Sequence, residues 1–421
     1  MSSRISRLVN MFLRAATLGV RFVFIFFLAR YLDPASIGYY GLFTATIVYC
    51  LYIVGLDFYV YLAREIVRAP EGQRGRLLKG QVALSAMLYA PVLPITILIL
   101  HHAGWPANLL WWLAPILLLE HVNQELFRLF VALSQQISAS LLLFVRQASW
   151  AIAALALMTL DVGSRKLDVV MALWACAGAA AAVLGLVKLR RLRMGGWRDA
   201  VDWQWVRKGV AVSMIFLVAT LSLRGVQTID RYWFQALGGI EMVAAYVLFL
   251  GMTGALIVFL DAGVFSYAYP ELIRLAHEGK HELIRRRVGQ MLLQTATACV
   301  AFAICSWLVL PLLLDWVGNP VYKDAIHLYP WILTAMVINA LGLVPHYALY
   351  AQGLDRHIIC SHLAALPVFA LSTWLVSMFQ PVLAVPIGLS AAFTLILVWK
   401  AIAYWWYDRD AGAPKSSAGT S

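Results

Sequence analysis

The 421-residue chain has little charge, since only 13% of its residues are Asp, Glu, Lys or Arg, whereas 62% are hydrophobic. Apolar runs of about 20 residues recur from end to end, and this length matches the hydrocarbon core of a bilayer. Runs without alternation of apolar and polar residues exclude a transmembrane β-barrel, so the backbone must satisfy its hydrogen bonds within helices. The sequence therefore predicts an all-α polytopic membrane protein.

The sequence also lacks the motifs of common catalytic and metal sites. It has no Gly-rich phosphate loop and no HExxH motif, and we place its nine histidines in loops and at span ends. Its five cysteines form no CxxC pair and lie in or beside apolar stretches, which indicates neither a disulfide framework nor a zinc site. We expect no enzymatic activity, no metal and no resident cofactor, while coupling to H⁺ or Na⁺ stays open.

Acidic residues are scarce, with 21 Asp and Glu against 33 Lys and Arg, a net charge of +12. In a soluble domain such an excess would suggest binding to nucleic acid. In a membrane protein it is explained by basic loops retained on the cytoplasmic side. We therefore expect membrane lipids, and no nucleic acid, among its partners.

Twelve spans are predicted from apolar runs bounded by charged residues or by Gly, Pro and Asn. They lie near residues 10–29, 37–60, 82–102, 108–127, 139–160, 167–187, 209–229, 240–262, 290–314, 325–350, 358–379 and 382–405. Placing both termini in the cytoplasm assigns most Lys and Arg to cytoplasmic segments, with Lys400 counted in the last of them. A miscount by one span would largely destroy this asymmetry.

The basic segment 188–208 divides the spans into two sets of six, and residue patterns repeat between the sets. GYYGLF before Leu56-Asp57 and EIVR in the first set match AAYVLF before Leu260-Asp261 and ELIR in the second. The order of these matches predicts an internal duplication, with two six-helix lobes about a pseudo-twofold axis along the membrane normal and a central cavity between them. The predicted parts are an N-terminal lobe (1–187), a basic cytoplasmic linker (188–208), a C-terminal lobe (209–407) and a disordered cytoplasmic tail (408–421).

Arginines lie unexpectedly deep in the spans that open the two sets. Arg21 is near the middle of its span and Arg224 is three-quarters across its own, and we expect both to line the cavity because buried charge faces a bundle interior. A guanidinium keeps its charge when buried and fits phosphate oxygens bidentately. Arg14 and Arg21 lie seven residues apart and form one polar stripe on the first span with Asn10 and Thr17. Arg14 either faces the cavity with Arg21 or extends to the lipid headgroups. A salt bridge within the protein, Arg224 with Asp230 or Asp230 with Arg231, is the alternative.

A second polar group lies where the fourth span ends. Glu120, Gln124 and Arg128 are four residues apart on one helix face, Glu125 lies on another face, and Arg146 enters the next span. This group is a gate latch, a pair of proton-linked carboxylates or, the interpretation that we favour, a structural network between the two spans.

Two further acidic residues, Asp57 and Asp261, end corresponding spans of the two sets. Their duplication favours a conformational or packing role, and we place them with Asp230 in a gating network. Few acidic residues lie deep in the predicted spans, which argues against tight proton coupling.

Several stretches resemble bacterial polysaccharide-biosynthesis flippases of the O-antigen type, which belong to the multidrug, oligosaccharidyl-lipid and polysaccharide exporter superfamily. They include FFLARYLDPASIGYYGLF, GLDFYVYLAREIVR, EHVNQELFRLFVALSQQISASLLLFVRQASW, IDRYWFQALGGIEMVAAYVLF and FLDAGVFSYAYPELI. The resemblance implies alternating access that moves undecaprenyl-diphosphate-linked oligosaccharide to the outer leaflet of the bacterial inner membrane, for export of O-antigen, capsule or exopolysaccharide.

The same resemblance implies roles for the arginines. Arg21, Arg224 and Arg231 would bind the anionic pyrophosphate and glycan, with Arg14 and Arg146 as secondary candidates. A polysaccharide polymerase and other synthesis proteins would be partners.

Three alternatives stay open. A drug or cation antiporter of the same superfamily would need carboxylates facing the cavity, and the deep charges here are mostly arginines. A membrane-embedded glycan polymerase or ligase would need a large outer loop, whereas the predicted outer loops are short. A non-transporting scaffold is opposed only weakly by the intramembrane arginines.

Overall fold

The structure, a computed structural model, describes residues 3–412, and within them the side chains of 8–214 and 217–409. The regular elements in this range are all helices. They form two compact units, Met1–Arg224 and Gly225–Ser421, and the division falls inside one long helix, α9. The last helix, α16, continues to Gly412, and the rest of the predicted disordered tail lies outside the described residues.

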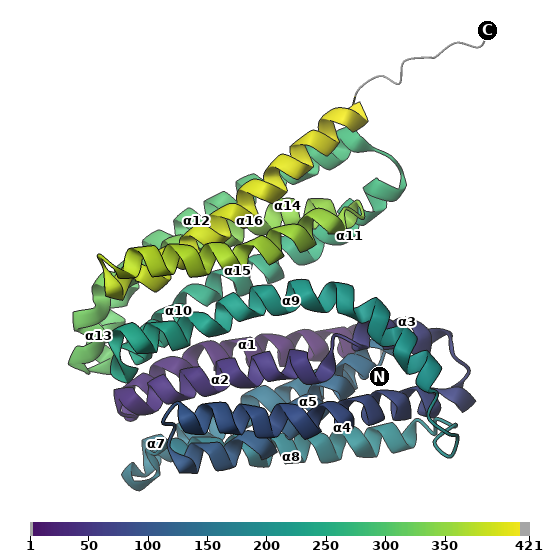
Figure 1. Ribbon diagram of the computed structural model, residues 1–421, viewed down its shortest axis with the longest axis horizontal. Coiled ribbons are helices and arrows are strands. Elements are labelled where there is room, and N and C mark those ends of the chain that lie inside the picture. The colour runs from purple at the N-terminus through teal and green to yellow at the C-terminus, as the bar shows by residue number, and fades with distance from the viewer. Residues whose placement is uncertain (1–2, 413–421) are drawn as a thin grey trace. The chain divides into compact units, whose positions relative to one another are not determined.

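Unit 1 contains long helices that run side by side (Figure 1). Its elements are α1 Ser3–Tyr31, α2 Pro34–Gly55, α3 Tyr59–Arg68, α4 Glu71–His102, α5 Ala107–Ala132, α6 Gln136–Phe144, η1 Val145–Ser149, α7 Trp150–Leu160, η2 Val162–Ser164, α8 Leu167–Arg191 and the first part of α9 Trp203–Gly238.

Unit 2 contains the rest of α9 and a second set of long helices, in which α16 packs on both α14 and α15. Its other elements are α10 Ile240–Leu260, η3 Asp261–Phe265, α11 Ser266–His277, α12 His281–Val317, α13 Pro320–Asp324, η4 Ala325–Leu328, α14 Tyr329–Ala351, α15 Asp355–Ser377 and α16 Pro381–Gly412.

Within residues 3–412, ten helical segments are long and apolar enough to cross a membrane, or eleven if the two halves of α9 count as one span. The 26-residue α5 is not among them, since its second half carries both charged and uncharged polar residues, yet it coincides with the predicted span 108–127. All twelve predicted spans thus fall on helices, and the prediction of an all-α polytopic membrane fold is confirmed.

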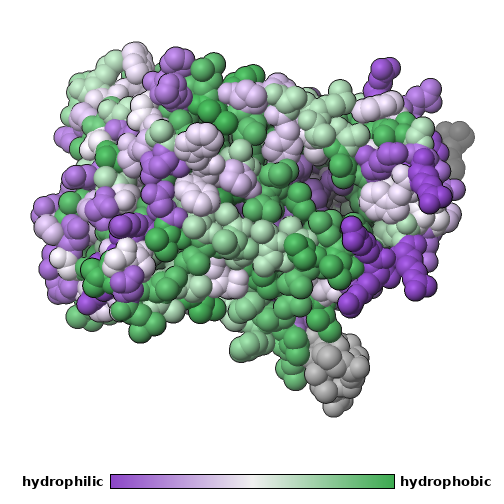
Figure 2. Space-filling view, turned by 90° about the horizontal axis from the view of Figure 1, so that it is seen from below, coloured by the Kyte–Doolittle hydropathy of each residue, from purple (hydrophilic) through white to green (hydrophobic). Residues whose placement is uncertain are grey.

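The surface of these helices is apolar where lipid is expected. Figure 2 shows hydrophobic side chains across the middle of the visible face and hydrophilic ones gathered toward its left and right ends. On α4 and α8 of unit 1, the exposed large apolar side chains include Val82, Met87, Ile95, Val183 and Leu186. Apolar side chains that face acyl chains replace the usual polar surface of a soluble bundle.

The boundaries of α2 follow from its sequence. Asp33 caps its start by accepting a hydrogen bond from the Ser36 amide at 2.9 Å, and Pro34 occupies the first turn, where no amide donor is needed. The helix ends because Leu56 and Asp57 adopt left-handed conformations, with φ of 49° and 50°. Asp57 therefore lies in a turn between α2 and α3.

The segments 61–81 and 263–289 lie between predicted spans and were expected as cytoplasmic loops. The structure instead contains α3 and the start of α4 in the first, and α11 and the start of α12 in the second. The reason is that α3 is amphipathic: Tyr61, Leu62 and Ile66 are buried beside Phe58, whereas its charged residues stay outside. Such a helix can form at the membrane surface without an apolar run long enough to span.

Each unit also contains one π-helical turn inside a span. In unit 1, η1 joins α6 to α7 and carries Arg146, and in unit 2, η3 joins α10 to α11 and begins at Asp261. A π-turn inserts an extra residue into an α-helix and is frequent at functional sites.

Candidate functional site: a polar cavity in unit 1

Unit 1 contains a cavity of about 270 Å³ between α1, α2, α5, η1, α7 and α8. Its lining combines arginines, amides and aromatic rings. The lining residues are Arg21, Phe24, Ile25, Tyr40, Thr44, Ile47, Val48, Leu51, Tyr52, Glu120, Gln124, Arg146, Gln147, Trp150, Ala151 and Trp174.

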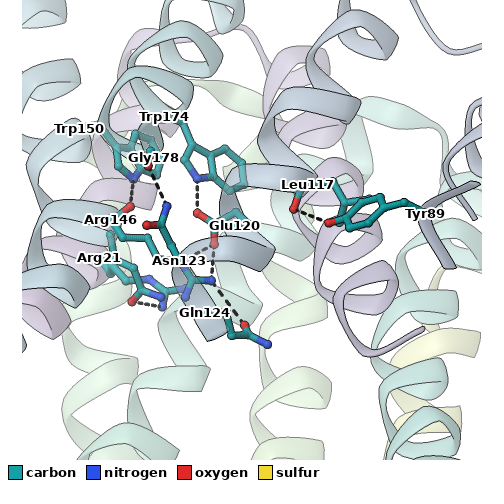
Figure 3. A network of polar contacts seen from close by, with 11 residues as sticks. Arg21, Tyr89, Leu117, Glu120, Asn123, Gln124, Arg146, Trp150, Trp174 and Gly178 are labelled. Carbon is teal, nitrogen blue, oxygen red and sulfur yellow. Dashed lines mark hydrogen bonds and ion pairs between the residues drawn. The ribbon is translucent and has the colours of Figure 1, made fainter. Parts of the chain in front are cut away.

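The centre of the site is a buried ion pair between Glu120 of α5 and Arg146 of η1 (Figure 3). Both Nε and Nη2 of Arg146 donate to one carboxylate oxygen of Glu120, with Nε at 2.7 Å. The other carboxylate oxygen accepts from the Trp174 indole at 2.8 Å. Because every partner is a strong donor, the carboxylate is held in one orientation between α5, η1 and α8.

An aromatic wall stands beside this ion pair. The rings of Trp150 and Trp174 are stacked, with centroids 5.4 Å apart and an interplanar angle of 10°, and Phe24 meets Trp150 edge to face at 4.9 Å. The Trp150 indole donates to the Arg146 carbonyl at 3.1 Å, which ties the wall to η1. Flat, rigid faces of this kind pack against flat or ring-shaped ligands at low conformational cost.

Arg21 lies at the exposed side of the cavity. Its Nη1 donates to the amide oxygen of Gln147 at 3.1 Å, and this contact joins α1 to η1. A guanidinium has five N–H donors, so one such bond leaves capacity for a ligand. The predicted deep arginine is therefore part of a polar cavity, although it is more exposed than a fully buried charge.

A second network continues from Gln124 along α5. The Gln124 amide lies between two guanidiniums: its oxygen is 3.5 Å from Arg146 in one orientation and 3.0 Å from Arg128 in the other. Arg128 pairs with Glu125 at 2.6 Å and lies over the Tyr59 ring at 3.7 Å from its centroid. The structure thus brings together the polar residues predicted at the end of the fourth span.

The other predicted arginines of unit 1 have different surroundings. Arg14 donates to Ser140 at 3.2 Å, and Ser140 also bonds Asn10, so this group joins α1 to α6. Arg224 lies over the Tyr52 ring at 5.3 Å from its centroid, and Tyr52 lines the cavity. Arg14 is therefore part of a helix contact, whereas Arg224 reaches the cavity wall.

Asp57 lies beside this part of unit 1, just past the end of α2, and is 5% exposed. Burial raises the pKa of its carboxyl, although a hydrogen bond from Thr220 and the charges of Arg128 and Arg224 act in the opposite direction. Its predicted counterpart, Asp261, is exposed, begins η3 and accepts from the Tyr347 hydroxyl at 3.3 Å. The two carboxylates thus differ in backbone and environment because α2 breaks where α10 continues as a π-turn.

Arg231 and Asp230 belong to unit 2. Asp230 is 3% exposed and accepts from the Tyr246 hydroxyl at 2.8 Å and from the Arg231 backbone amide at 2.7 Å. This carboxylate serves the packing of α9 against α10. The roles in substrate binding and gating that the sequence suggests for these residues stay predictions.

Two features of the structure were not predicted from the sequence. One is the tryptophan wall of Trp150 and Trp174 beside the ion pair. The other lies in unit 2, where Lys400 is buried among histidines although it was counted with the cytoplasmic end of the chain. Among the described residues, no group of three or more His, Cys, Asp or Glu is placed to hold a metal.

Comparison with known proteins gives the family. The family described as "Polysaccharide biosynthesis protein" matches residues 7–276, more than half of the chain. The chain belongs to this family. No curated protein sequence matches it.

Solved structures of transporters share its fold. An inward-facing multidrug resistance MATE family transporter of the MOP superfamily is 14% identical, with a TM-score of 0.69 over 96% of both chains. An outward-facing MATE transporter is 12% identical, with a TM-score of 0.64 over 97% of this chain and 95% of the other. A MOP superfamily transporter from Pyrococcus furiosus, described as having a binding pocket of reverse polarity, is 13% identical, with a TM-score of 0.59 over the same shares. At these identities the similarity shows the fold.

Proposed function

We propose that this protein is a flippase that moves undecaprenyl-diphosphate-linked oligosaccharide from the cytoplasmic to the outer leaflet of the bacterial inner membrane. Membership of the polysaccharide biosynthesis family supports this class of cargo, and the fold shared with MOP superfamily transporters supports a transport activity. Alternating access between inward- and outward-open states is the proposed mechanism.

The observation that carries the proposal is the chemistry of the unit 1 cavity. Two guanidiniums and the amides of Gln124 and Gln147 surround a single carboxylate, Glu120, which already pairs with Arg146 and Trp174. Arg21 thus remains to attract an anion, and the tryptophan wall suits the apolar faces of sugar rings. A cargo that joins a diphosphate to a glycan has both features, and its polyprenyl tail would stay in lipid.

The decisive test is deletion of the gene in a strain that exports polysaccharide, followed by analysis of the lipid-linked intermediates. If the protein is a flippase, its deletion leaves complete lipid-linked repeat units on the cytoplasmic face. Their accumulation on the outer face would instead indicate a polymerase or ligase and would overturn the proposal.

The binding site is tested by substitution in the same strain. Arg21→Ala and Arg224→Ala are each expected to abolish export while the protein still inserts, and Arg21→Lys to restore part of it because charge returns without the bidentate fork. Arg191→Ala, at the exposed end of α8, is the matched control and should export normally. Normal export from both Arg21→Ala and Arg224→Ala would exclude these arginines as the anion site.

A drug or cation antiporter is the second candidate. The MATE transporters of the same fold favour it, and so does the aromatic wall, since rings also attract organic cations. Against it stands the pairing of Glu120 with Arg146, which neutralises the carboxylate that a cation would need. Faster ethidium efflux from cells that express the protein, with unchanged lipid intermediates on deletion, would favour the antiporter.

A further inference from the structure

Unit 2 buries a lysine between two histidines. Lys400 of α16 is 2% exposed, and its Nζ lies 3.2 Å from Nδ1 of His346 on α14 and 3.0 Å from Nε2 of His362 on α15. The two imidazole rings are stacked, with an interplanar angle of 9°. Three helices of the unit therefore meet at one basic cluster.

The cluster contains no carboxylate. None of the ion pairs among the described residues includes Lys400, and no acidic side chain hydrogen-bonds to it there. A buried charge without a counter-ion is costly in a membrane protein, and such residues mark ion or proton pathways. A purely structural contact between three helices would not require this cost.

Groups on the neighbouring helices do not supply the missing charge. On α12, residues 288–314 contain no Asp, Glu, Lys, Arg or His. Beside His346 lie the rings of Tyr347 and Tyr350, and beyond these tyrosines lie Tyr269 of α11 and the carboxylate of Asp261. One turn after Lys400 lies Tyr404, and beyond it lie Arg285 and Asp408.

The chemistry of the cluster allows one proton to be exchanged without breaking its hydrogen bonds. With Lys400 as an ammonium, it donates to the lone pairs of both imidazole nitrogens. When the proton of its third N–H leaves to water, the neutral amine keeps two N–H donors and can still donate to both imidazole nitrogens. A second added proton would put two positive charges about 3 Å apart, which Coulomb repulsion opposes.

We propose that Lys400, His346 and His362 form a proton-binding site that couples proton exchange to the transport cycle. The coupling rests on the proposed transport function, whereas proton binding does not. The site differs from the carboxylates expected for coupling, because it is basic and gains or loses one positive charge. The buried hydroxyl of Tyr404, which has no hydrogen-bond partner among the described residues, lies one turn along α16 and marks a path for the proton toward the end of that helix.

The binding part is tested by solid-state NMR of the full-length protein in lipid nanodiscs with ¹⁵Nζ-labelled lysine. One lysine resonance is expected to change from ammonium to neutral amine between about pH 5 and 9, where ordinary lysines stay charged. The same resonance should be missing from Lys400→Arg, because this variant has no labelled lysine nitrogen at position 400. Wild-type spectra in which every lysine stays an ammonium would overturn the proton site, whatever the activity.

The coupling part is tested by polysaccharide export in a deletion strain. Lys400→Arg should reduce export on the order of tenfold, a size typical of coupling between sites. The matched control, Lys323→Arg at an exposed ion pair, should export normally. Normal export by Lys400→Arg would overturn the coupling. Failure of the wild type to restore export would reject the flippase function and leave the NMR result to decide the proton site.

Discussion

Unit 1 and unit 2 each bury a cationic side chain where three helical segments meet, but the partners of the two cations differ. In unit 1, Arg146 faces Glu120, and Trp174 completes the carboxylate's hydrogen bonds. In unit 2, Lys400 faces two neutral imidazoles. The first cation has a permanent charge and a counter-ion, whereas the second has neither.

This difference separates two uses of buried charge. A guanidinium paired with a carboxylate holds its position because either partner alone would be a buried, uncompensated charge. A lysine among imidazoles can change its charge while its hydrogen bonds persist. We infer that the unit 1 network fixes the walls of a binding cavity and that the unit 2 cluster is the part that changes state.

The largest effect is expected when the unit 1 cation loses its counter-ion. Glu120→Gln leaves Arg146 buried without a carboxylate and should lower the free energy of unfolding by about 3–5 kcal/mol, measured by denaturation in detergent micelles. Glu120→Gln with Arg146→Met should recover much of this loss because no buried charge remains. The control is Asp315→Asn in the exposed pair with Lys323, which should cost about 0–1 kcal/mol. A loss as small as the control's would mean that water reaches Arg146.

The converse change gives the unit 2 cation a counter-ion. His362→Glu places a carboxylate beside Lys400 and should keep this lysine an ammonium up to about pH 9 in the ¹⁵N experiment, since an opposite charge favours the charged form. Export should fall on the order of tenfold because the proton can no longer leave. The exposed His327→Glu is the control. Undiminished export with a permanently charged Lys400 would show that transport does not need proton release from this cluster.

A smaller effect is expected from removing one donor of the unit 1 network. Trp174→Phe keeps an aromatic ring but deletes the indole N–H that donates to Glu120, at a cost of about 1.5–3 kcal/mol in unfolding free energy. Trp111→Phe, at a residue 81% exposed, should be nearly neutral. Equal effects of the two substitutions would show that the hydrogen bond contributes nothing beyond ring packing.

The smallest effect concerns pH and Asp57. Its pKa is raised in the folded protein by burial, so the folded state binds a proton more readily than the unfolded state. The wild type should therefore gain stability as pH falls through this raised pKa and lose it as pH rises, by linkage. Asp57→Asn removes the charge, and its advantage in Tm over the wild type should grow with rising pH. A constant difference between acid and neutral pH would contradict this.

The sequence predicted the fold well because apolar length is a local property. Each predicted span falls on a helix. The helices between the spans were missed, among them α3, α11 and the starts of α4 and α12, because an amphipathic surface helix lacks a long apolar run. The predicted group at Glu120 and Arg146 could be found because its residues lie on consecutive spans. Lys400 and His346 could not be paired in this way, since helix rotation and packing, rather than spacing, bring them together.

The π-turn η1 has a consequence for how this protein tolerates insertions and deletions. Each residue of an α-helix turns the chain by about 100°, so one residue removed from Val145–Ser149 would rotate Leu141 and its neighbours against Trp150 by that angle. The helix would become more regular, yet the polar face of α6 and the aromatic face of α7 would no longer point into the same space. The number of residues in this one turn thus sets the rotation of α6 relative to α7. A deletion here would damage the cavity more than most substitutions of its lining.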